Sequence, residues 1–198
     1  MSKIVVFMNL TLDGVMQAPG RPDEDRRGGF EHGGWATPYA TMEAAEESMA
    51  YTGALLLGRR TYEDFYAVWP NRTDNPFTAV LNNTQKYVAS TTLSEPLPWS
   101  NSTLLKGDAA EAVARLKEEP GKDFVVLGSG ELVQSLMRRN LVDEYVLLIH
   151  PLVLGSGRRL FADGGAFAAL RLVGTKTTTT GVVIATYSLP DLRDSIVV

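Results

Sequence analysis

The sequence predicts an α/β protein with a central, mostly parallel sheet and an antiparallel C-terminal edge. Three observations support this fold class. Apolar, strand-like runs alternate with helical patterns as far as about residue 150, and two of these runs lead directly into a glycine and then a helix. Beyond residue 150, β-rich segments dominate. We expect one domain over residues 1–198, with a core at about 3–188 and a tail at 189–198.

The first half of the chain alternates apolar runs with turn-rich segments. Residues 11–34 hold six glycines, two prolines and a charged cluster, which indicates a long lid or binding loop or, alternatively, a solvated insertion. Thr37 followed by Pro38 is typical of a helix start. The expected elements are a strand at 3–10, a helix from Pro38 to about Tyr51, a strand at 54–57, a helix at 59–66, a segment at 77–81 that fits either type, and strands at 86–90 and 102–105.

The second half contains the clearest helix, at 108–118, where Asp108 and Glu111 resemble a capping box. The run at 123–127 is wholly apolar, as expected of a strand buried inside a parallel sheet. The remaining elements are a helix at 131–139, a strand at 143–150 that ends at Pro151, an extended piece at 158–161, and strands at 170–179 and 181–188 that form a hairpin with Gly181 at or near its turn.

The composition is that of an ordinary water-soluble protein, with 44% apolar and 21% charged residues. A formal net charge of -4 argues against a dedicated nucleic-acid surface, although local arginines can still bind a phosphorylated small molecule. The absence of cysteine excludes disulfides, cysteine zinc sites and thiol nucleophiles. The chain has only two histidines, His32 and His150, which are far apart in the sequence, and this argues against a histidine-rich metal site. Neither a signal peptide nor a membrane span is recognisable, so we expect a cytoplasmic protein.

The strongest motif runs from Phe124 to Leu132, where an apolar strand leads into Gly128-Ser129-Gly130 and then a helix that opens with Glu131 and Leu132. Glycines let a ligand approach the backbone closely, and a helix N-terminus offers free N–H groups to a phosphate. The motif is neither the six-residue Rossmann fingerprint nor a P-loop. It predicts a pyrophosphate site, and its alternative is a tight strand-to-helix turn without a ligand.

A second motif runs from Ala54 to Tyr62, where a buried strand leads into Gly58-Arg59-Arg60-Thr61. Two cations at a helix N-terminus are electrostatically disfavoured unless they meet an anion. Arginine suits phosphate oxygens, and the 2′-phosphate of an adenosine ribose would favour NADPH over NADH. The alternative is a solvated pair of arginines. A third, weaker motif is Met8 to Val15, where the first strand ends in Asp13-Gly14.

In combination and order, these motifs resemble the dihydrofolate reductase-like superfamily, and most of all the C-terminal reductase domain of riboflavin-biosynthesis deaminase/reductases and its stand-alone bacterial relatives. The resemblance spans about residues 4–188 and rests on the stretches 9–14, 57–62, 86–92, 126–130 and 141–161. It implies a three-layer α/β/α fold, a homodimer, and hydride transfer from a nicotinamide to a C=N or C=O carbon, as in 5-amino-6-(5-phosphoribosylamino)uracil reductase.

The resemblance also implies a cofactor site. Leu12, Asp13 and Gly14 would lie near the nicotinamide, and Ser90 and Thr91 near the adenine and 2′-phosphate. The adenosine phosphates would meet Gly58, Arg59, Arg60 and Thr61, and the pyrophosphate would meet Gly128, Ser129 and Gly130, with Glu131 and Leu132 opening the helix behind it. The residues from Pro151 to Gly157 would form a loop near the cofactor or the dimer contact.

A reductase of this kind also needs a proton donor. Asp13 is the first candidate, because the resemblance puts it beside the nicotinamide, and its alternative is to accept hydrogen bonds from backbone N–H groups in its turn. Glu31 and His32 in the long loop are second choices, with a solvent-exposed His32 as the alternative. For His150, at a strand end before Pro151, we expect a structural role.

The sequence departs from its relatives in three ways. A folate reductase presents a carboxylate from its first long helix, but Glu43, Glu46 and Glu47 here fall in no matching motif. There is no zinc deaminase domain, and no phosphoribosyl-binding cluster is recognisable. The prediction is therefore an NADPH-dependent reductase of a small heterocyclic or carbonyl substrate. The alternatives are a non-catalytic module that binds NADPH or a flavin, and a flavin- or folate-binding protein on the same sheet.

Overall fold

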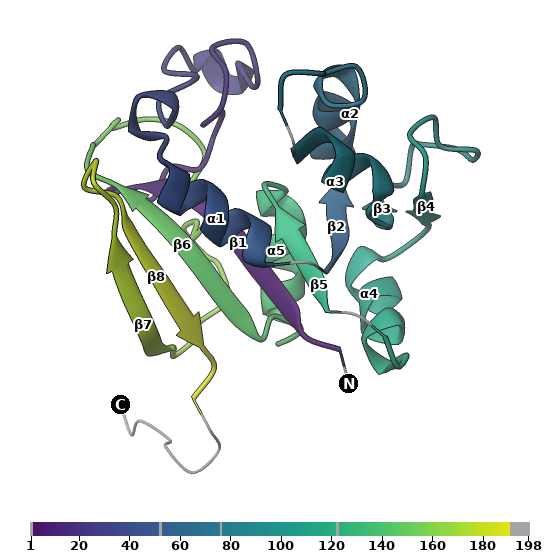
Figure 1. Ribbon diagram of the computed structural model, residues 1–198. Coiled ribbons are helices and arrows are strands. Elements are labelled where there is room, and N and C mark those ends of the chain that lie inside the picture. The colour runs from purple at the N-terminus through teal and green to yellow at the C-terminus, as the bar shows by residue number, and fades with distance from the viewer. Residues whose placement is uncertain (1, 52, 76, 122, 191–198) are drawn as a thin grey trace.

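The computed structural model describes residues 2–51, 53–75, 77–121 and 123–190. One eight-stranded sheet lies between two layers of helices (Figure 1). The strands are β1 (Ile4–Thr11), β2 (Ala54–Gly58), β3 (Lys86–Ala89), β4 (Ser102–Leu105), β5 (Phe124–Leu127), β6 (Glu144–His150), β7 (Arg171–Thr177) and β8 (Val183–Ser188). The helices are α1 (Met42–Ala50), α2 (Arg59–Val68), α3 (Phe77–Asn83), α4 (Ala109–Glu118) and α5 (Gly130–Arg138), with short 3₁₀ helices at Arg27–Gly29 and Thr37–Tyr39.

The sheet has the strand order β4-β3-β2-β5-β1-β6-β8-β7. Neighbouring strands from β4 to β6 are parallel, whereas β8 pairs antiparallel with β6 and β7 pairs antiparallel with β8. The mostly parallel sheet with an antiparallel C-terminal edge is therefore confirmed. Because parallel strands end at the same edge, the turns that follow β1, β2, β3, β5 and β6 are gathered there, on the upper side in Figure 1.

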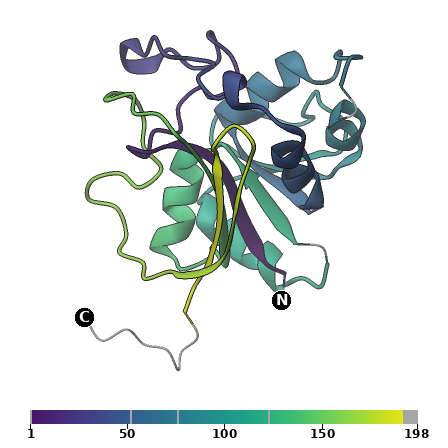
Figure 2. The same ribbon diagram turned by 60° about the vertical axis from the view of Figure 1, so that its left-hand side comes forward.

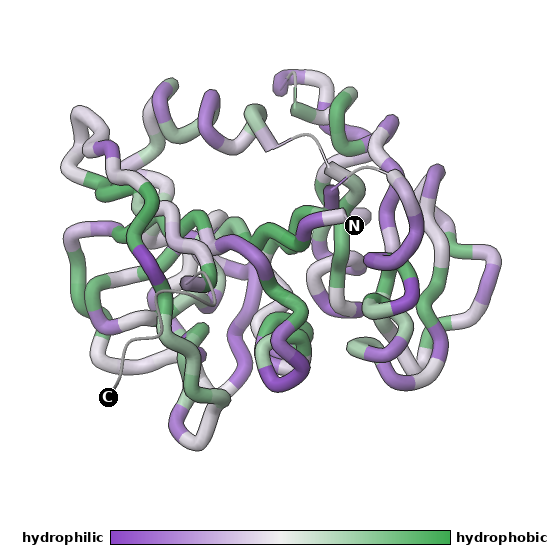
Figure 3. The backbone as a smooth tube through the Cα atoms, turned by 90° about the horizontal axis from the view of Figure 1, so that it is seen from below, coloured by the Kyte–Doolittle hydropathy of each residue, from purple (hydrophilic) through white to green (hydrophobic). Residues whose placement is uncertain are grey.

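The two faces of the sheet are covered by different helices, as Figure 2 shows for α1 and α5. Alternate residues of a strand point to opposite faces, and β1 follows this rule. Ile4 and Val6 pack with α4 and α5, whereas Val5 and Phe7 pack on the side of α1, α2 and α3. The central strands β1 and β5 are buried along most of their length, as expected of a sheet that is covered on both faces. Hydrophobic segments cross the middle of the molecule in Figure 3.

The first long helix begins later than the sequence suggested. Thr37 and Pro38 start only the short 3₁₀ helix, and Ala40 returns to an extended conformation. The N-cap of α1 is Thr41, whose side chain accepts a hydrogen bond from Ala44 N at 3.3 Å. The prediction of a helix from Pro38 was therefore wrong at its start, because a second hydroxyl residue four positions later caps a longer helix.

Other boundaries follow the sequence more closely. Asp108 caps α4 and accepts from Glu111 N at 2.7 Å, but the Glu111 carboxylate pairs with Arg115 instead of completing a capping box. The segment that fitted either type is the helix α3. Gly181, with φ of 83°, lies in the turn between β7 and β8 as expected. Residues 158–161 form no full strand, and only a bridge joins Val15 to Arg159.

The proposed tail at 189–198 lies mostly outside the described residues. Within the part of the chain that the structure describes, we find no helix with the length and apolar character needed to cross a membrane.

Candidate functional site

The turns after β2 and β5 are locked together at the carboxyl edge of the sheet. Ser129 Oγ accepts from Gly58 N at 2.9 Å, and Ser129 N donates to Thr61 Oγ1 at 3.1 Å. Ser129 Oγ also donates to Leu127 O at 3.0 Å, so its hydroxyl proton is used as well. Ser129 therefore holds the two strand–glycine–helix turns, after β2 and after β5, in a fixed position relative to each other.

The glycines of this turn are required by its geometry. Gly128 has φ of 55°, and a Cβ there would lie 3.2 Å from Thr61 Cγ2 and Oγ1. A Cβ on Gly130 would lie 2.5 Å from Met16 Sδ. Ser129 itself has φ of 56°, an uncommon conformation for a residue with a side chain. Segments from β1, β2 and β5 therefore meet at the N-terminus of α5, and only backbone fits between them.

Arginines converge on the carboxylate of Glu131, in the first turn of α5. Arg158 donates to Glu131 Oε1 at 3.1 Å, and Arg27 and Arg60 each place a guanidinium nitrogen 3.6 Å from that oxygen. Arg59, at the start of α2, pairs with Glu63 at 3.8 Å and remains partly exposed. Arg27 is held more closely by Asp25, at 2.6 Å, so three guanidinium groups face two carboxylates and leave a smaller excess of positive charge that suits an anion.

The other residues predicted to bind a cofactor are either exposed at the carboxyl edge of the sheet or engaged in their own turn or helix. Leu12 and Thr91 are exposed at the edge, and Gly14 with φ of 79° forms the turn after β1. Ser90 Oγ accepts from the N–H groups of Thr92 and Leu93, so that hydroxyl shapes its own turn. The Leu132 side chain is buried in the core, and only its backbone N–H faces the helix N-terminus.

Asp13 has the environment of a hydrogen-bond acceptor. Its carboxylate accepts from Thr11 Oγ1 at 2.6 Å, Leu154 N at 3.2 Å and Gly155 N at 2.9 Å. The hydrogen bond from Thr11, with those from the two backbone N–H groups, lowers the pKa of Asp13 to about 2 despite partial burial. An acid this strong is ionised at neutral pH, so the geometry favours the structural alternative over proton donation.

The other residues considered as a proton donor or as a substrate-binding carboxylate lie away from the locked turns. Glu31 and His32 are exposed in the loop after β1, where the edge of the His32 ring contacts Phe30. On α1, the Glu47 carboxylate is bound by Lys176 Nζ at 2.6 Å, and Glu43 and Glu46 are exposed. None of these carboxylates reaches the locked turns in the described part of the chain.

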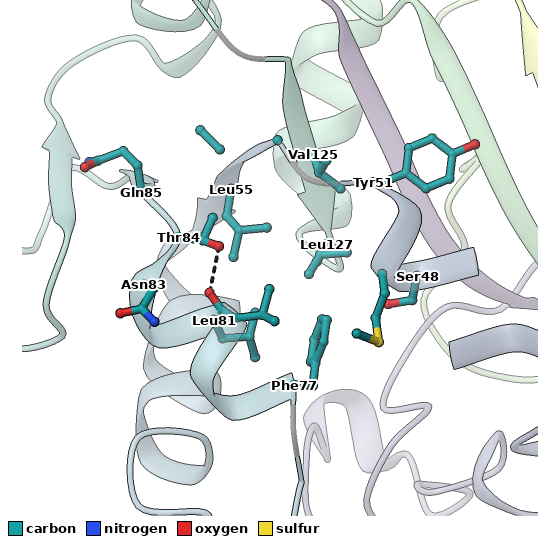
Figure 4. A pocket seen from close by; sticks show the side chains of 14 residues that line it. Ser48, Tyr51, Leu55, Phe77, Leu81, Asn83, Thr84, Gln85, Val125 and Leu127 are labelled. Atoms are coloured by element: carbon teal, nitrogen blue, oxygen red, sulfur yellow. Dashed lines mark hydrogen bonds between the residues drawn. The ribbon is translucent and has the colours of Figure 1, made fainter. Parts of the chain in front are cut away.

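A cavity of about 450 Å³ lies on the α1 side of the sheet, between α1 and α3 (Figure 4). Leu55, Val125 and Leu127 of the sheet form part of its wall, Phe77 lines it from α3, and Tyr51 lies directly after α1. The described residues around it carry no formal charge: Ser48, Met49, Tyr51, Gly53, Ala54, Leu55, Phe77, Val80, Leu81, Asn83, Thr84, Gln85, Val125 and Leu127. Leu127 is the last residue of β5, whereas Gly53, Ala54, Thr84 and Gln85 lie at the amino ends of β2 and β3, so the cavity extends along the sheet from near the Gly128 turn toward its opposite edge.

Asn9 and His150 form a polar pair on the same face of the sheet. His150 Nε2 lies 3.0 Å from Asn9 Oδ1. The ring of His150 is only 3% exposed, and Trp35 and Tyr39 pack against it edge-on with centroid distances of 5.1 and 5.5 Å. Burial lowers the pKa of His150 to about 4, so the imidazole is neutral at physiological pH.

The chain matches the family model of the RibD C-terminal domain over residues 2–184. It belongs to the RibD C-terminal domain family. The chain is also similar to the uncharacterized protein YyaP of Bacillus subtilis (strain 168). The two are 33% identical over 138 residues, which are 67% of this chain and 72% of YyaP.

The fold of the chain is similar to that of several solved structures. A protein described as a riboflavin biosynthesis protein, from Shewanella sp. PV-4, matches with a TM-score of 0.68 and 21% identity over 96% of this chain and 99% of its own. Dihydrofolate reductase from Enterococcus faecalis, complexed with NADP(H) and RAB-propyl, matches with a TM-score of 0.60 and 14% identity over 96% and 97%. These likenesses confirm the dihydrofolate reductase-like fold. Family and fold together support a reductase-like function.

The sequence did not predict the Asn9–His150 pair or the cavity between α1 and α3. Asn9 interrupts an otherwise apolar strand on the side shared with Val5 and Phe7, and His150 ends another apolar strand. Two polar residues near the ends of two strands were the available signal. The signal was incomplete because only the sheet order shows that β1 and β6 are neighbours.

Proposed function

We propose that this protein is an NADPH-dependent reductase of a small, uncharged carbonyl or ring C=N compound. The observation that carries the proposal is the pair of strand–glycine–helix turns locked by Ser129, with arginines around the N-terminus of α5. Free N–H groups and guanidinium groups at one sheet edge fit the phosphates of a dinucleotide. The cradle suits phosphates chemically, because Gly128 and Gly130 of the turn are only partly buried and the N-terminus of α5 offers backbone N–H groups.

Arg59 and Arg60 are proposed to select NADPH over NADH. Both residues open α2 directly after β2, whose neighbours in the sheet are β3 and β5. The Arg60 guanidinium lies 3.6 Å from Glu131 at the N-terminus of α5. Arg59 is engaged only by the weak, exposed pair with Glu63, so a 2′-phosphate competes with little. When bound, the cofactor would supply a hydride, and the protein would hold the phosphates and orient the nicotinamide toward the end of β1.

The cavity between α1 and α3 is proposed to hold the body of the substrate. Its described lining is apolar or neutral, and it extends along the sheet from near the Gly128 turn. A sugar phosphate in such a cavity would lack a cationic partner and would lose its hydration without compensation. We therefore favour a neutral ring or carbonyl compound over the phosphoribosylated substrate of the riboflavin pathway.

Thermal unfolding with NADPH, NADH, FMN or no addition tests the cofactor assignment. A ligand that binds only the native state raises the apparent unfolding temperature by an amount set by its concentration over Kd. We expect the largest rise with NADPH. No rise at millimolar NADPH would contradict the proposal, and a rise only with FMN would favour the flavin-binding alternative.

Turnover separates the reductase from a non-catalytic NADPH-binding module. The readout is the loss of NADPH absorbance with a panel of neutral aldehydes, ketones and ring imines, each paired with a phosphorylated analogue where one exists. We expect oxidation with neutral members and little with their phosphorylated partners. Binding of NADPH without oxidation by any panel member would favour the non-catalytic module.

A further inference from the structure

The pair Asn9–His150 carries an unsatisfied group that the cofactor cradle does not explain. His150 Nδ1 is buried and has no hydrogen-bond partner among the described residues. A buried polar atom without a partner costs about 1–3 kcal/mol, so such atoms are rare in folded proteins and call for an explanation. The ring is nevertheless held firmly, because Trp35 and Tyr39 pack on it and Nε2 meets Asn9.

The contact between the two side chains determines how each is oriented. An amide oxygen only accepts hydrogen bonds, so the nitrogen of His150 that meets Asn9 Oδ1 must carry the proton. The neutral ring thus has its proton on Nε2 and a bare Nδ1. Because Oδ1 is held by the ring, the two N–H groups of Asn9 Nδ2 point elsewhere, and no described group accepts a hydrogen bond from them.

The sheet places these free N–H groups level with the turn that is proposed to bind the cofactor. In the parallel register, Phe7 of β1 is level with Leu127 of β5, and Asn9 is two residues further along β1. Asn9 is therefore level with the Gly128–Ser129 turn that follows β5. It lies on the face of α1 and the cavity, since Val5 and Phe7 point to that face. Asn9 is partly exposed, so its amide is accessible.

We propose that Asn9 is the electrophilic hydrogen-bond donor of the reaction and that His150 is the positioning residue that aims its amide. The inference rests on the proposed reductase function. It specifies a substrate with a neutral hydrogen-bond acceptor, a carbonyl oxygen or ring imine nitrogen, at the atom bonded to the carbon that receives hydride.

The chemistry is balanced with a reduced nicotinamide as the hydride donor. Bound NADPH would supply the hydride and become NADP⁺, a new C–H bond would form at the substrate carbon, and the π pair of C=O or C=N would move to the heteroatom. Asn9 Nδ2 donates to that heteroatom as its negative charge grows, which is the arrangement that stabilises such transition states. Water supplies the proton that completes the alcohol or amine.

Turnover of the best panel substrate by four variants tests the assignment. We expect Asn9→Ala to lower kcat by about 100-fold, with the Kd of NADPH within about twofold of wild type. His150→Leu should lower kcat by about tenfold, because Asn9 stays but loses its orientation. His150→Gln should restore kcat to within about threefold, because the glutamine amide again donates to Asn9 Oδ1.

Asn82→Ala is the matched structural control. Asn82 Oδ1 also accepts from a buried ring N–H, that of Trp99, at 2.7 Å, but this contact belongs to α3 and the loop before β4. We expect this variant to lower the unfolding temperature while leaving kcat unchanged. If Asn9→Ala and Asn82→Ala had the same effect on kcat, Asn9 would have a structural role only, and the inference would be wrong.

Nitrogen-15 NMR gives a readout that needs no turnover. We expect His150 to be neutral with Nε2 protonated, and the Asn9 side-chain amide signals, assigned by their loss in Asn9→Ala, to shift when a neutral pyridone is added to the NADP⁺-loaded protein. A proton on Nδ1, or amide signals that pyridone leaves unmoved, overturns the inference. Failure of NADPH itself to bind contradicts instead the proposed function.

Discussion

The locked turns at the carboxyl edge and the cavity between α1 and α3 are built from opposite kinds of residue. The turns gather glycines, hydroxyl groups and arginines, and their strongest contacts are polar. The cavity is lined by neutral, mostly apolar side chains, and the Asn9–His150 pair lies on the same face of the sheet. We expect a charged ligand to be stabilised by the first region and penalised by the second, so the two regions differ in the charge of the ligand that each suits.

The largest expected effect of a single substitution is on the turn itself. Gly128→Val puts a β-branched residue at φ of 55° and its Cβ 3.2 Å from Thr61, which breaks the contact that locks the two turns. We expect the Kd of NADPH to rise by about 100-fold, the equivalent of about 3 kcal/mol. Isothermal titration calorimetry measures this.

Gly107→Val is the control for that substitution. Gly107 has φ of 83° but no atom within 4 Å of an added Cβ, so this variant adds backbone strain without the contact. It should lower stability and leave the Kd of NADPH unchanged. Equal losses of affinity in the two variants would show that the locked turn is not part of the cofactor site.

The buried imidazole of His150 predicts that the free energy of unfolding depends on pH. The folded pKa of His150 is about 4, below the ordinary value of 6.5, so the unfolded state binds a proton first as the pH falls. The contribution of His150 is fully present above about pH 6.5 and is lost as the pH falls toward 4, by up to about 3 kcal/mol.

Urea unfolding from about pH 7 to about pH 4 measures this loss. His150→Gln should remove the part of the pH dependence that belongs to the buried ring, and the difference from wild type isolates it from carboxylates that titrate nearby. The matched control is His32→Gln, because His32 is exposed in the loop after β1. Identical curves for wild type and His150→Gln would mean that the ring is solvated or already charged.

A smaller effect is expected on cofactor preference. Arg59→Ala should narrow the preference for NADPH over NADH by about tenfold, because a charge-assisted hydrogen bond to the 2′-phosphate is lost. Arg115→Ala is the control, since Arg115 also forms an exposed helical pair with a glutamate, Glu111, but lies on α4. The ratio of the two Kd values is the readout, and an unchanged ratio in Arg59→Ala would refute the 2′-phosphate role.

The smallest effect should come from Glu131. Its carboxylate lies near three guanidinium groups at the N-terminus of α5, so it competes with an incoming phosphate. Glu131→Gln should lower the Kd of NADPH by about threefold, as expected of exposed ion pairs. The effect should shrink at high salt. A weaker affinity in this variant would mean that Glu131 orders the arginines for binding.

Features that depend on neighbouring residues could be predicted from the sequence, and those that depend on distant partners could not. The passage from an apolar strand through Gly128 into a helix is local, and so is the cap at Asp108. The predicted start of α1 was wrong because both Thr37 and Thr41 can cap a helix, and the Thr37 hydroxyl instead donates to Gly20 O, 17 positions away.

The site shows the same limit. Gly58 and Ser129 were each predicted as phosphate-turn residues, but the hydrogen bond that joins them spans 71 positions. Asn9 and His150 are 141 positions apart, and only the adjacency of β1 and β6 brings them together. Asp13 was found by its motif, and Thr11 is a local partner, but the backbone N–H groups of Leu154 and Gly155 that also donate to its carboxylate lie 141 and 142 positions away.

The most direct measurement of the central claim is isotopic. NADPH deuterated at C4 is mixed with the protein and the neutral carbonyl and ring-imine panel, and the products are examined by NMR. The account predicts deuterium on the carbon of the reduced C=O or C=N group, from the labelled face of the nicotinamide only. Bound NADPH that delivers no deuterium to any product would contradict the assignment of this protein as a reductase.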